Sequence, residues 1–152
     1  ILYTIMKHNE DEQEKQVIAS LIQTPDGTIL WSRFTHDYVG YIDANGEHYF
    51  IDGGKDYCRR SVNDNAPATP IPVFDDEPWE VQRQYRLWGS CGMWIPVGCL
   101  SNEHIENIIK DGYRNEGVQL EYEYRKKNNI IIPEHDYTDE QAMAITKPKG
   151  VE

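Results

Sequence analysis

Residues able to do chemistry gather between positions 36 and 60. A histidine next to an aspartate is typical of an oriented general base, and two adjacent arginines can bind a phosphate or a carboxylate. Two adjacent glycines let a backbone approach a ligand and offer N–H groups to an anion. The candidate ligand-binding residues are His36, Asp37, Asp52, Gly53, Gly54, Asp56, Arg59 and Arg60.

Two interpretations of this cluster stay open. In the first, the residues form a pocket for a nucleotide or another phosphate ligand. In the second, Asp37 and Asp52 pair with Arg59 and Arg60 to hold a turn, and the glycines supply positive φ angles. The segment lacks the Gly-Lys-Ser/Thr ending of a P-loop, and we assign no catalytic residue to it.

A second group of residues is typical of a protein-binding surface. Aromatic side chains are concentrated between positions 79 and 94, directly after an acidic run. Aromatic anchors rimmed by charge are characteristic of binding hot spots, although Tyr85 and Trp88 also fit the buried face of a helix. The candidate partner-binding residues are Asp75, Asp76, Glu77, Trp79 and Trp94.

Metal and cofactor chemistry has little support in the sequence. The three cysteines, Cys58, Cys91 and Cys99, form no CxxC pair, so a zinc site built on paired thiolates is not expected. His104 has no second histidine at the i+4 spacing of HExxH. Cys99 and His104 are close enough in sequence for a nucleophilic pair, but packing or helix capping is the favoured role of His104. We therefore expect no metal and no cofactor.

The N-terminal part of the chain predicts strands. Asp26-Gly27 and Asn45-Gly46 are turn signals between runs rich in β-branched and aromatic residues, and such pairs are typical of tight hairpins. We expect a four-stranded antiparallel meander over residues 16–52. Its strands would be residues 16–23, 28–34, 37–43 and 47–52.

The C-terminal part predicts helices. Ser101 is a good N-cap for a helix that ends at Asp111-Gly112, and residues 80–88 have an apolar helical face. Residues 114–128 carry both a strand-like alternation and helix-favouring acid–base pairs, and helix is the preferred interpretation. Shorter strands are expected at 93–100, as an irregular edge strand, and at 130–132.

Together these patterns predict an α+β fold with an N-terminal four-stranded antiparallel β meander followed by a mainly helical C-terminal lobe. The Pro- and Asn-rich stretch between the meander and the helical lobe is typical of a linker. The expected parts are a β-meander lobe at 1–62, a linker at 63–73, a helical lobe at 74–134 and a polar tail at 135–152.

Charge and hydropathy exclude some functions. The chain has 152 residues and a formal net charge of -11. A surface of this sign repels phosphate backbones, so direct nucleic-acid binding is not expected, whereas a basic protein partner is favoured. No apolar run reaches the roughly 20 residues that a membrane span needs. An odd number of cysteines suggests free thiols in a reducing cytosol.

The segment from Phe34 to Arg60 resembles a small domain of unknown function common in tailed-phage and bacterial genomes. Its pattern is His-Asp-aromatic, a tight turn, then Asp-Gly-Gly-x-Asp-Tyr-x-Arg-Arg, present here as residues 36–38 and 52–60. Shorter members carry cysteine knuckles in the two hairpin turns. These thiols are absent at 24–27 and 43–46, so zinc binding does not carry over.

The second half is similar to a pattern found with the first in T-even-like phages. It extends from Trp88-Gly89 through residues 100–105 to residues 120–125. The resemblance implies a phage accessory protein that acts in the host cytoplasm. No activity is assigned to that family.

We therefore expect a non-enzymatic phage accessory protein that binds and modulates a host protein, such as a defence or nucleic-acid enzyme. The alternative is a protein that binds, sequesters or cleaves a small nucleotide through the cluster at 36–60. A third interpretation is a structural, virion-associated protein. The sequence leaves the oligomeric state open.

Overall fold

The computed structural model describes residues 15–90 and 92–137, and the chain divides into two compact units. Unit 1 is Ile1–Pro78 and unit 2 is Trp79–Glu152. The described part of unit 1 is built from strands, and that of unit 2 combines helices with a two-stranded sheet. The α+β class expected from the sequence is confirmed.

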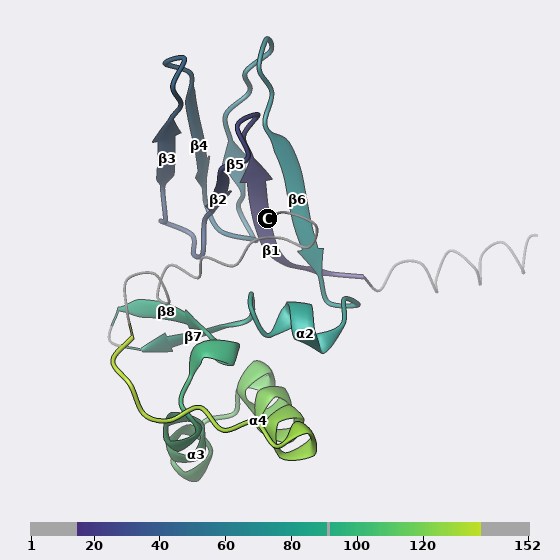
Figure 1. Ribbon diagram of the computed structural model, residues 1–152, viewed down its shortest axis with the longest axis vertical. Coiled ribbons are helices and arrows are strands. Elements are labelled where there is room, and N and C mark those ends of the chain that lie inside the picture. Colours follow the sequence, from purple (N-terminus) through teal and green to yellow (C-terminus); the bar gives the residue numbers. More distant parts are fainter. Residues whose placement is uncertain (1–14, 91, 138–152) are drawn as a thin grey trace, which may run out of the picture. The chain divides into compact units, whose positions relative to one another are not determined.

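From residue 15 onward, unit 1 contains two antiparallel sheets of three strands each (Figure 1). The first has the order β2-β1-β6 and the second the order β3-β4-β5. The strands are β1 (Val17–Gln23), β2 (Ile29–Trp31), β3 (Val39–Ile42), β4 (His48–Asp52), β5 (Arg59–Arg60) and β6 (Thr69–Phe74).

The expected four-stranded meander is corrected by this topology. All four predicted strands form, and both hairpin turns lie where Asp26-Gly27 and Asn45-Gly46 predict them. However, β2 and β3 belong to different sheets. The chain turns between them, because the Ser32 hydroxyl donates to the carbonyl oxygen of Asp37 at 2.6 Å and the Asp37 carboxylate accepts from the Arg33 N–H at 2.9 Å.

The expected linker at 63–73 is also corrected. Its second half lies in β6, which pairs with nearly the whole of β1 from Val17↔Phe74 to Gln23↔Thr69. Two of the three prolines that suggested a linker lie in β6. They are compatible with it because it is an edge strand, where a missing N–H can face away from the ladder. The boundary between the units therefore falls after Pro78.

The core of unit 1 lies between its two sheets. Ile22 of β1, Leu30 of β2, and Tyr49 and Ile51 of β4 form one buried cluster. The hydroxyl of Tyr49 donates to the carbonyl oxygen of Ala66 at 2.8 Å, so this buried polar group is satisfied. Because Tyr49 and Ile51 point inward, the alternate residues of β4 point to the opposite face of the sheet.

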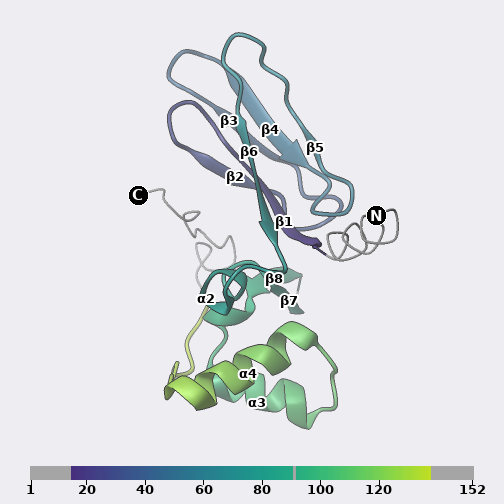
Figure 2. The ribbon, with the colours of Figure 1, turned by 90° about the vertical axis from the view of Figure 1, so that its right-hand side faces the viewer.

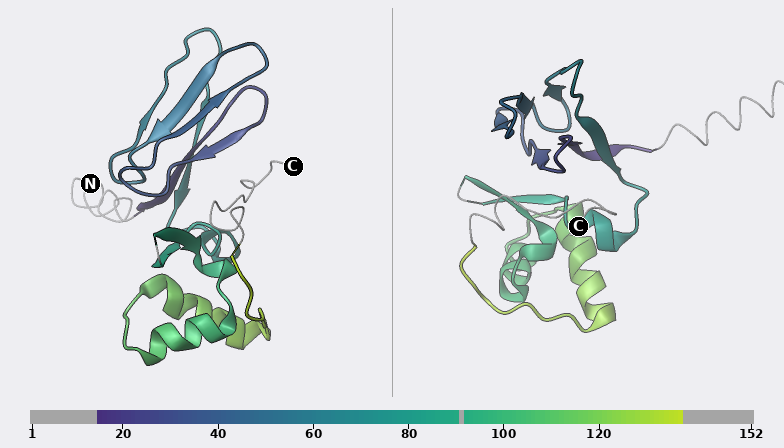
Figure 3. Two further views of the ribbon diagram at one scale, coloured as in Figure 1. Left: turned by 90° about the vertical axis from the view of Figure 1, so that its left-hand side faces the viewer. Right: turned by 45° about the horizontal axis from the view of Figure 1, so that its top comes forward.

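The described part of unit 2 contains a hairpin and three helical segments besides one 3-10 turn (Figures 2 and 3). The predicted helix at 80–88 is wrong beyond its first turn, since Leu87–Ser90 pairs as a strand with Met93–Pro96. The described residues at 130–132 form no strand. The elements are α2 (Trp79–Gln82), β7 (Leu87–Ser90), β8 (Met93–Pro96), η1 (Val97–Cys99), α3 (Asn102–Lys110) and α4 (Glu116–Asn128).

The two long helices are confirmed, and α3 and α4 lie side by side (Figure 2). The Ser101 hydroxyl caps α3 by accepting from the His104 N–H at 3.1 Å. The ambiguous stretch 114–128 is mostly helix, capped by the Asn115 side chain at its start. Both helices pack on a core formed by Ile95, Val97, Leu100, Ile105, Ile108 and Val118.

No helix within residues 15–90 and 92–137 is both long and apolar enough to cross a bilayer. The predicted polar tail lies mostly outside the described residues. Its described part, residues 135–137, contacts the beginning of α3, where the Tyr137 hydroxyl accepts from the Ser101 N–H at 3.2 Å.

Candidate functional site

The two turns of the predicted cluster meet in unit 1 through one side chain. The Ser32 hydroxyl accepts from the Gly54 N–H at 2.9 Å and donates to the carbonyl oxygen of Asp37. The structure therefore brings the His-Asp-Tyr segment and the Asp-Gly-Gly segment together, as the sequence interpretation required. Ser32, which is 1% exposed, is the residue that this interpretation missed.

The backbone N–H groups of the two glycines at this junction are used in hydrogen bonds within the fold. The Gly53 N–H donates to the Asp52 carboxylate at 2.8 Å, and the Gly54 N–H is held by Ser32. Gly53 has a φ of 90°, and a Cβ on it would lie 1.8 Å from the carbonyl oxygen of Tyr57. Neither N–H is left to bind an anion, so the structural interpretation of the two glycines is favoured.

The charged residues of the cluster do not converge on one point. Asp52 pairs with Arg59 at 2.7 Å, as the structural interpretation predicted. Asp37 instead binds the Arg33 N–H, and Asp56 pairs with Lys55 at 2.8 Å. His36 and Arg60 are exposed. A catalytic group and a phosphate clamp aimed at the same point are not present among these side chains.

A group of aromatic side chains lies on the surface of the same sheet. The rings of Tyr38 and Phe50 stack with centroids 5.5 Å apart and an interplanar angle of 18°. The ring of His48 lies 6.3 Å from that of Phe50, and its Nε2 is 3.2 Å from the Tyr38 hydroxyl. Three rings, one from the residue directly before β3 and two from β4, are thus fixed against one another.

Gly40 makes this arrangement possible. It pairs with Phe50 across β3 and β4, and a Cβ on it would lie 3.1 Å from the Tyr38 ring and 3.4 Å from the His48 Nε2. The missing side chain lets the Tyr38 ring lie across the strand toward His48. This is the close approach for which glycine occurs inside strands.

We call the surface that these residues share the outer face of the sheet β3–β4–β5. Its residues alternate along the strands with the buried residues, so their side chains point away from the core of unit 1. Tyr38 is 56% exposed and Ile42 is 65% exposed. The outer face consists of Tyr38, Gly40, Ile42, His48, Phe50 and Asp52.

The predicted partner-binding residues lie in different surroundings, some used by the fold and some exposed. Asp75 is used by the sheet, because its backbone and carboxylate both bind Gln16. Asp76 pairs loosely with Lys15 at 3.7 Å. Trp79 packs against the core of unit 2, while Trp94 is 39% exposed. Glu77 donates its N–H to the Phe74 carbonyl oxygen at 3.3 Å.

Unit 2 contains a buried charged network that the sequence did not predict. Glu121 is 0% exposed and accepts from Trp79 at 2.9 Å, from Arg83 at 2.9 and 2.6 Å, and from Arg125 at 2.6 Å. Burial alone would raise the pKa of Glu121, but hydrogen bonds from Arg83, Arg125 and Trp79 outweigh it and hold the pKa below its usual value.

Arg125 connects this network to other segments of unit 2. Its guanidinium donates to the Asn102 side chain at 2.8 Å and to the carbonyl oxygens of Val97 and Gly98 at 3.2 and 3.3 Å. The Asn102 oxygen also accepts from the Ile132 N–H at 2.9 Å. These groups bind one another, which is typical of a structural network and not of a catalytic one.

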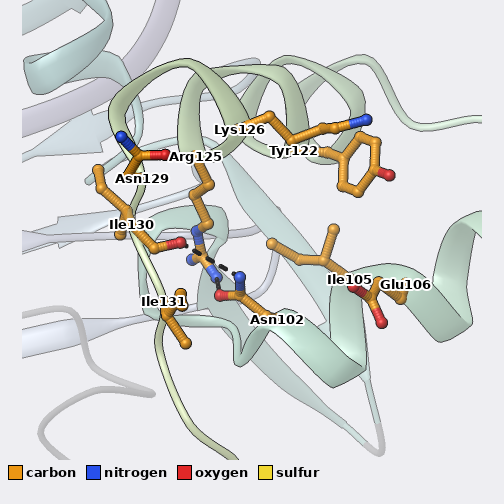
Figure 4. A pocket seen from close by; sticks show the side chains of 9 residues that line it. All are labelled: Asn102, Ile105, Glu106, Tyr122, Arg125, Lys126, Asn129, Ile130 and Ile131. Atoms are coloured by element: carbon orange, nitrogen blue, oxygen red, sulfur yellow. Dashed lines mark hydrogen bonds between the residues drawn. The ribbon is translucent and has the colours of Figure 1, made fainter.

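A cavity of about 280 Å³ lies beside this network (Figure 4). Arg125 and Asn102 approach it from α4 and α3, but their polar atoms are already bonded to each other and to the Ile130 carbonyl oxygen. The cavity is lined by Asn102, Ile105, Glu106, Tyr122, Arg125, Lys126, Asn129, Ile130 and Ile131.

The His104 ring is hydrogen-bonded to a neighbouring side chain. Its Nδ1 is 2.8 Å from the Tyr137 hydroxyl, and burial lowers its pKa. A packed role for His104 is therefore favoured. Within residues 15–90 and 92–137, no group of three or more His, Cys, Asp or Glu side chains is arranged to hold a metal ion.

Compared with protein-family models, with curated proteins and with solved structures, the chain gives no match. What it binds is therefore inferred from its own side chains.

Proposed function

We propose that the protein is a non-enzymatic binding protein that docks onto another protein through the outer face of its sheet β3–β4–β5. The observation that carries this proposal is the surface group of the exposed Tyr38 and His48 and the half-buried Phe50, whose rings are held by stacking and by a hydrogen bond. Aromatic side chains supply large contact area, and fixing them before binding lowers the entropic cost of association.

The composition of the outer face supports a protein partner. It combines aromatic rings and the exposed Ile42 with the Asp52–Arg59 ion pair at one end. Apolar and aromatic anchors next to a polar rim are typical of protein interfaces. The net charge of -11 favours a partner with a basic surface.

The resemblance of residues 34–60 to proteins of tailed phages suggests the kind of partner. We propose a host protein in the host cytoplasm, with a defence enzyme or a nucleic-acid enzyme as the natural case, because such enzymes carry basic surfaces that normally bind phosphate backbones.

Removing two outer-face side chains tests this proposal. Tyr38→Ala combined with Ile42→Ser should weaken partner binding by about 30-fold or more, since interface anchors commonly contribute about 2 kcal/mol or more together. The measurement is native mass spectrometry of tagged protein recovered gently from host cells during infection, followed by titration of the recovered partner against both forms.

The chain offers a matched control in unit 2. Tyr113 and Ile131 are a second exposed Tyr and Ile, 63% and 80% exposed, and Tyr113→Ala with Ile131→Ser should leave binding unchanged. If the two double variants behave alike, or if no protein is recovered in defined stoichiometry, the outer face is not the binding surface.

A second candidate function is nucleotide binding at the other end of the cluster. Tyr57 is 65% exposed, the Arg59 guanidinium lies 5.8 Å from its ring centroid, and Arg60 is exposed beside them. An exposed ring with two arginines could stack on a base and bind its phosphates.

Arg59→Ala with Arg60→Ala separates the two functions. The Asp52–Arg59 pair is exposed on the arginine side, so its loss should lower the free energy of unfolding by less than about 1 kcal/mol. We expect the variant to recover the same partner protein as the unaltered chain. A small bound mass of nucleotide size that disappears only in this variant would instead support nucleotide binding.

A further inference from the structure

Strand β3 is an edge strand, and its hydrogen-bonding pattern can be assigned. The Asp43 N–H donates to the Glu47 carbonyl oxygen at 3.0 Å, directly beyond the pair Ile42↔His48. In an antiparallel ladder, only alternate residues bond to a given neighbour. Val39, Tyr41 and Asp43 therefore face β4, and the backbone groups of Gly40 and Ile42 face away from it.

The outer edge of β3 has no neighbouring strand within the part of the chain that the structure describes (Figure 1). Gly40 and Ile42 are both exposed, and residues 39–42 include no proline and no charged side chain. Each of the two residues offers one N–H and one C=O to this edge, in the spacing that an extended chain can match.

Two other edges of unit 1 are protected against strand addition. In β6, Pro70 and Pro72 pair with Ile22 and Ser20 of β1, and since proline has no N–H, these are the positions that face outward. In β5 the edge is two residues long and consists of Arg59 and Arg60. Prolines, short length and charge are the usual devices that prevent edge pairing. Strand β3 has four residues with neither proline nor charge, and it is longer than the remaining edge strand β2, which has three.

We propose that an extended segment of the partner protein adds to β3 as a fourth strand of the sheet β3–β4–β5. This inference rests on the proposed function and names how the partner binds. Backbone bonds to Gly40 and Ile42 supply the register, and side chains on one face of the added strand lie beside Tyr38 and Ile42. Strand addition of this kind is an established mode of peptide recognition.

Charge at both ends of β3 defines the partner further. The carboxylates of Asp37 and Asp43 flank the strand directly, and Glu47 follows across the turn. Asp43 already accepts from the N–H groups of Asn45 and Glu47 at 2.9 Å, which leaves its negative charge in place. The added segment therefore has apolar residues at alternate positions and basic residues at its ends.

A designed peptide tests strand addition directly, whichever protein supplies the natural segment. The probe alternates Val and Thr between pairs of Lys, and it is N-methylated on the amides of one edge so that it cannot pair with itself. In NMR titrations with the full chain, we expect hydrogen exchange at the Gly40 and Ile42 amides to slow by about tenfold or more at saturation, because exposed amides become hydrogen-bonded. The same peptide methylated on both edges should not bind.

Two substitutions at one residue separate backbone from side chain. Ile42→Ser and Ile42→Pro both remove the apolar side chain, but only proline removes the outward N–H. Since that N–H does not bond to β4, the ladder of the sheet is retained. Ile42→Pro should weaken the peptide by about tenfold more than Ile42→Ser, the value of one lost backbone hydrogen bond.

The remaining outcomes are distinct. Shifts at the rings of Tyr38, His48 and Phe50 without slower exchange at Gly40 and Ile42 overturn strand addition but leave the proposed function standing. Absence of any shift at millimolar peptide also overturns strand addition. If Ile42→Pro fails to fold, equal binding of the singly and doubly methylated peptides overturns strand addition in its place. Slow exchange at both amides before peptide is added, with twice the mass of the chain, would overturn it by showing that a second copy covers the edge.

Discussion

Glu121→Ala should lower the free energy of unfolding of unit 2 by about 3–5 kcal/mol, the usual result of removing one member of a buried ion pair. The change leaves Arg125, which is 3% exposed, and the largely buried Arg83 without their shared carboxylate. The Trp79 indole N–H loses its acceptor as well. Chemical unfolding, followed by tryptophan fluorescence and by hydrogen exchange in α4, measures the loss.

Glu123→Ala is the matched control, because Glu123 lies on the same helix and is exposed. It should change the free energy of unfolding by less than about 0.5 kcal/mol. If Glu121→Ala is equally mild, the network does not stabilise unit 2.

The lowered pKa of Glu121 adds a pH dependence. Because the pKa is lower in the folded state than in the unfolded chain, the network stabilises unit 2 above the usual glutamate range near pH 4.5. This contribution is lost as the pH falls through the folded-state pKa. Acid unfolding of Glu121→Gln should therefore be less steep than that of the unaltered chain over this range.

Gly53→Ala should be the most damaging single-methyl addition in unit 1. A Cβ at this position lies 1.8 Å from the Tyr57 carbonyl oxygen, and the φ of 90° is unfavourable for any residue with a side chain. We expect a loss of at least about 2 kcal/mol in the free energy of unfolding. The Asp52–Arg59 pair and the Ser32–Gly54 bond should break together, which NMR of residues 52–60 would detect.

Gly46→Ala separates the two causes of that loss. Gly46 has a φ of 81°, yet a Cβ on it would have no neighbour within 4 Å. This variant should lose only the backbone term of about 1 kcal/mol. If Gly53→Ala and Gly46→Ala lose the same free energy of unfolding, the backbone around Tyr57 moves aside without cost and the close approach does not matter.

Local signals predicted much of the fold. The hairpins at Asp26-Gly27 and Asn45-Gly46, the Ser101 cap and the helix over most of 114–128 follow from short-range turn and capping chemistry. Strand β6 was missed because its prolines indicate a linker, and only pairing with β1 shows that they occupy an edge. The helix at 80–88 was wrong because Leu87 and Trp88 find strand partners in Pro96 and Ile95.

The candidate site was predicted only in part. The sequence grouped the segment at 36–38 with the segment at 52–54, and Ser32 bridges the two. One of its two interpretations also paired the aspartates with the arginines, and the Asp52–Arg59 pair forms. It did not identify the outer face, since both faces of β3 and β4 carry aromatic residues and alternation alone does not tell which face is buried. The Glu121–Arg125 spacing is an ordinary i,i+4 pair, usually solvated, and only packing shows that it is buried.

The two edges of the sheet β3–β4–β5 differ, and this difference has a consequence for assembly, since the edge of β3 is open whereas that of β5 is two residues long and consists of arginines. A sheet that can be extended on one side only can end another protein's sheet, but it cannot pass the pairing on through its own far edge. Complexes formed through this sheet should therefore keep a fixed one-to-one composition at high concentration, where a sheet with two open edges would polymerise.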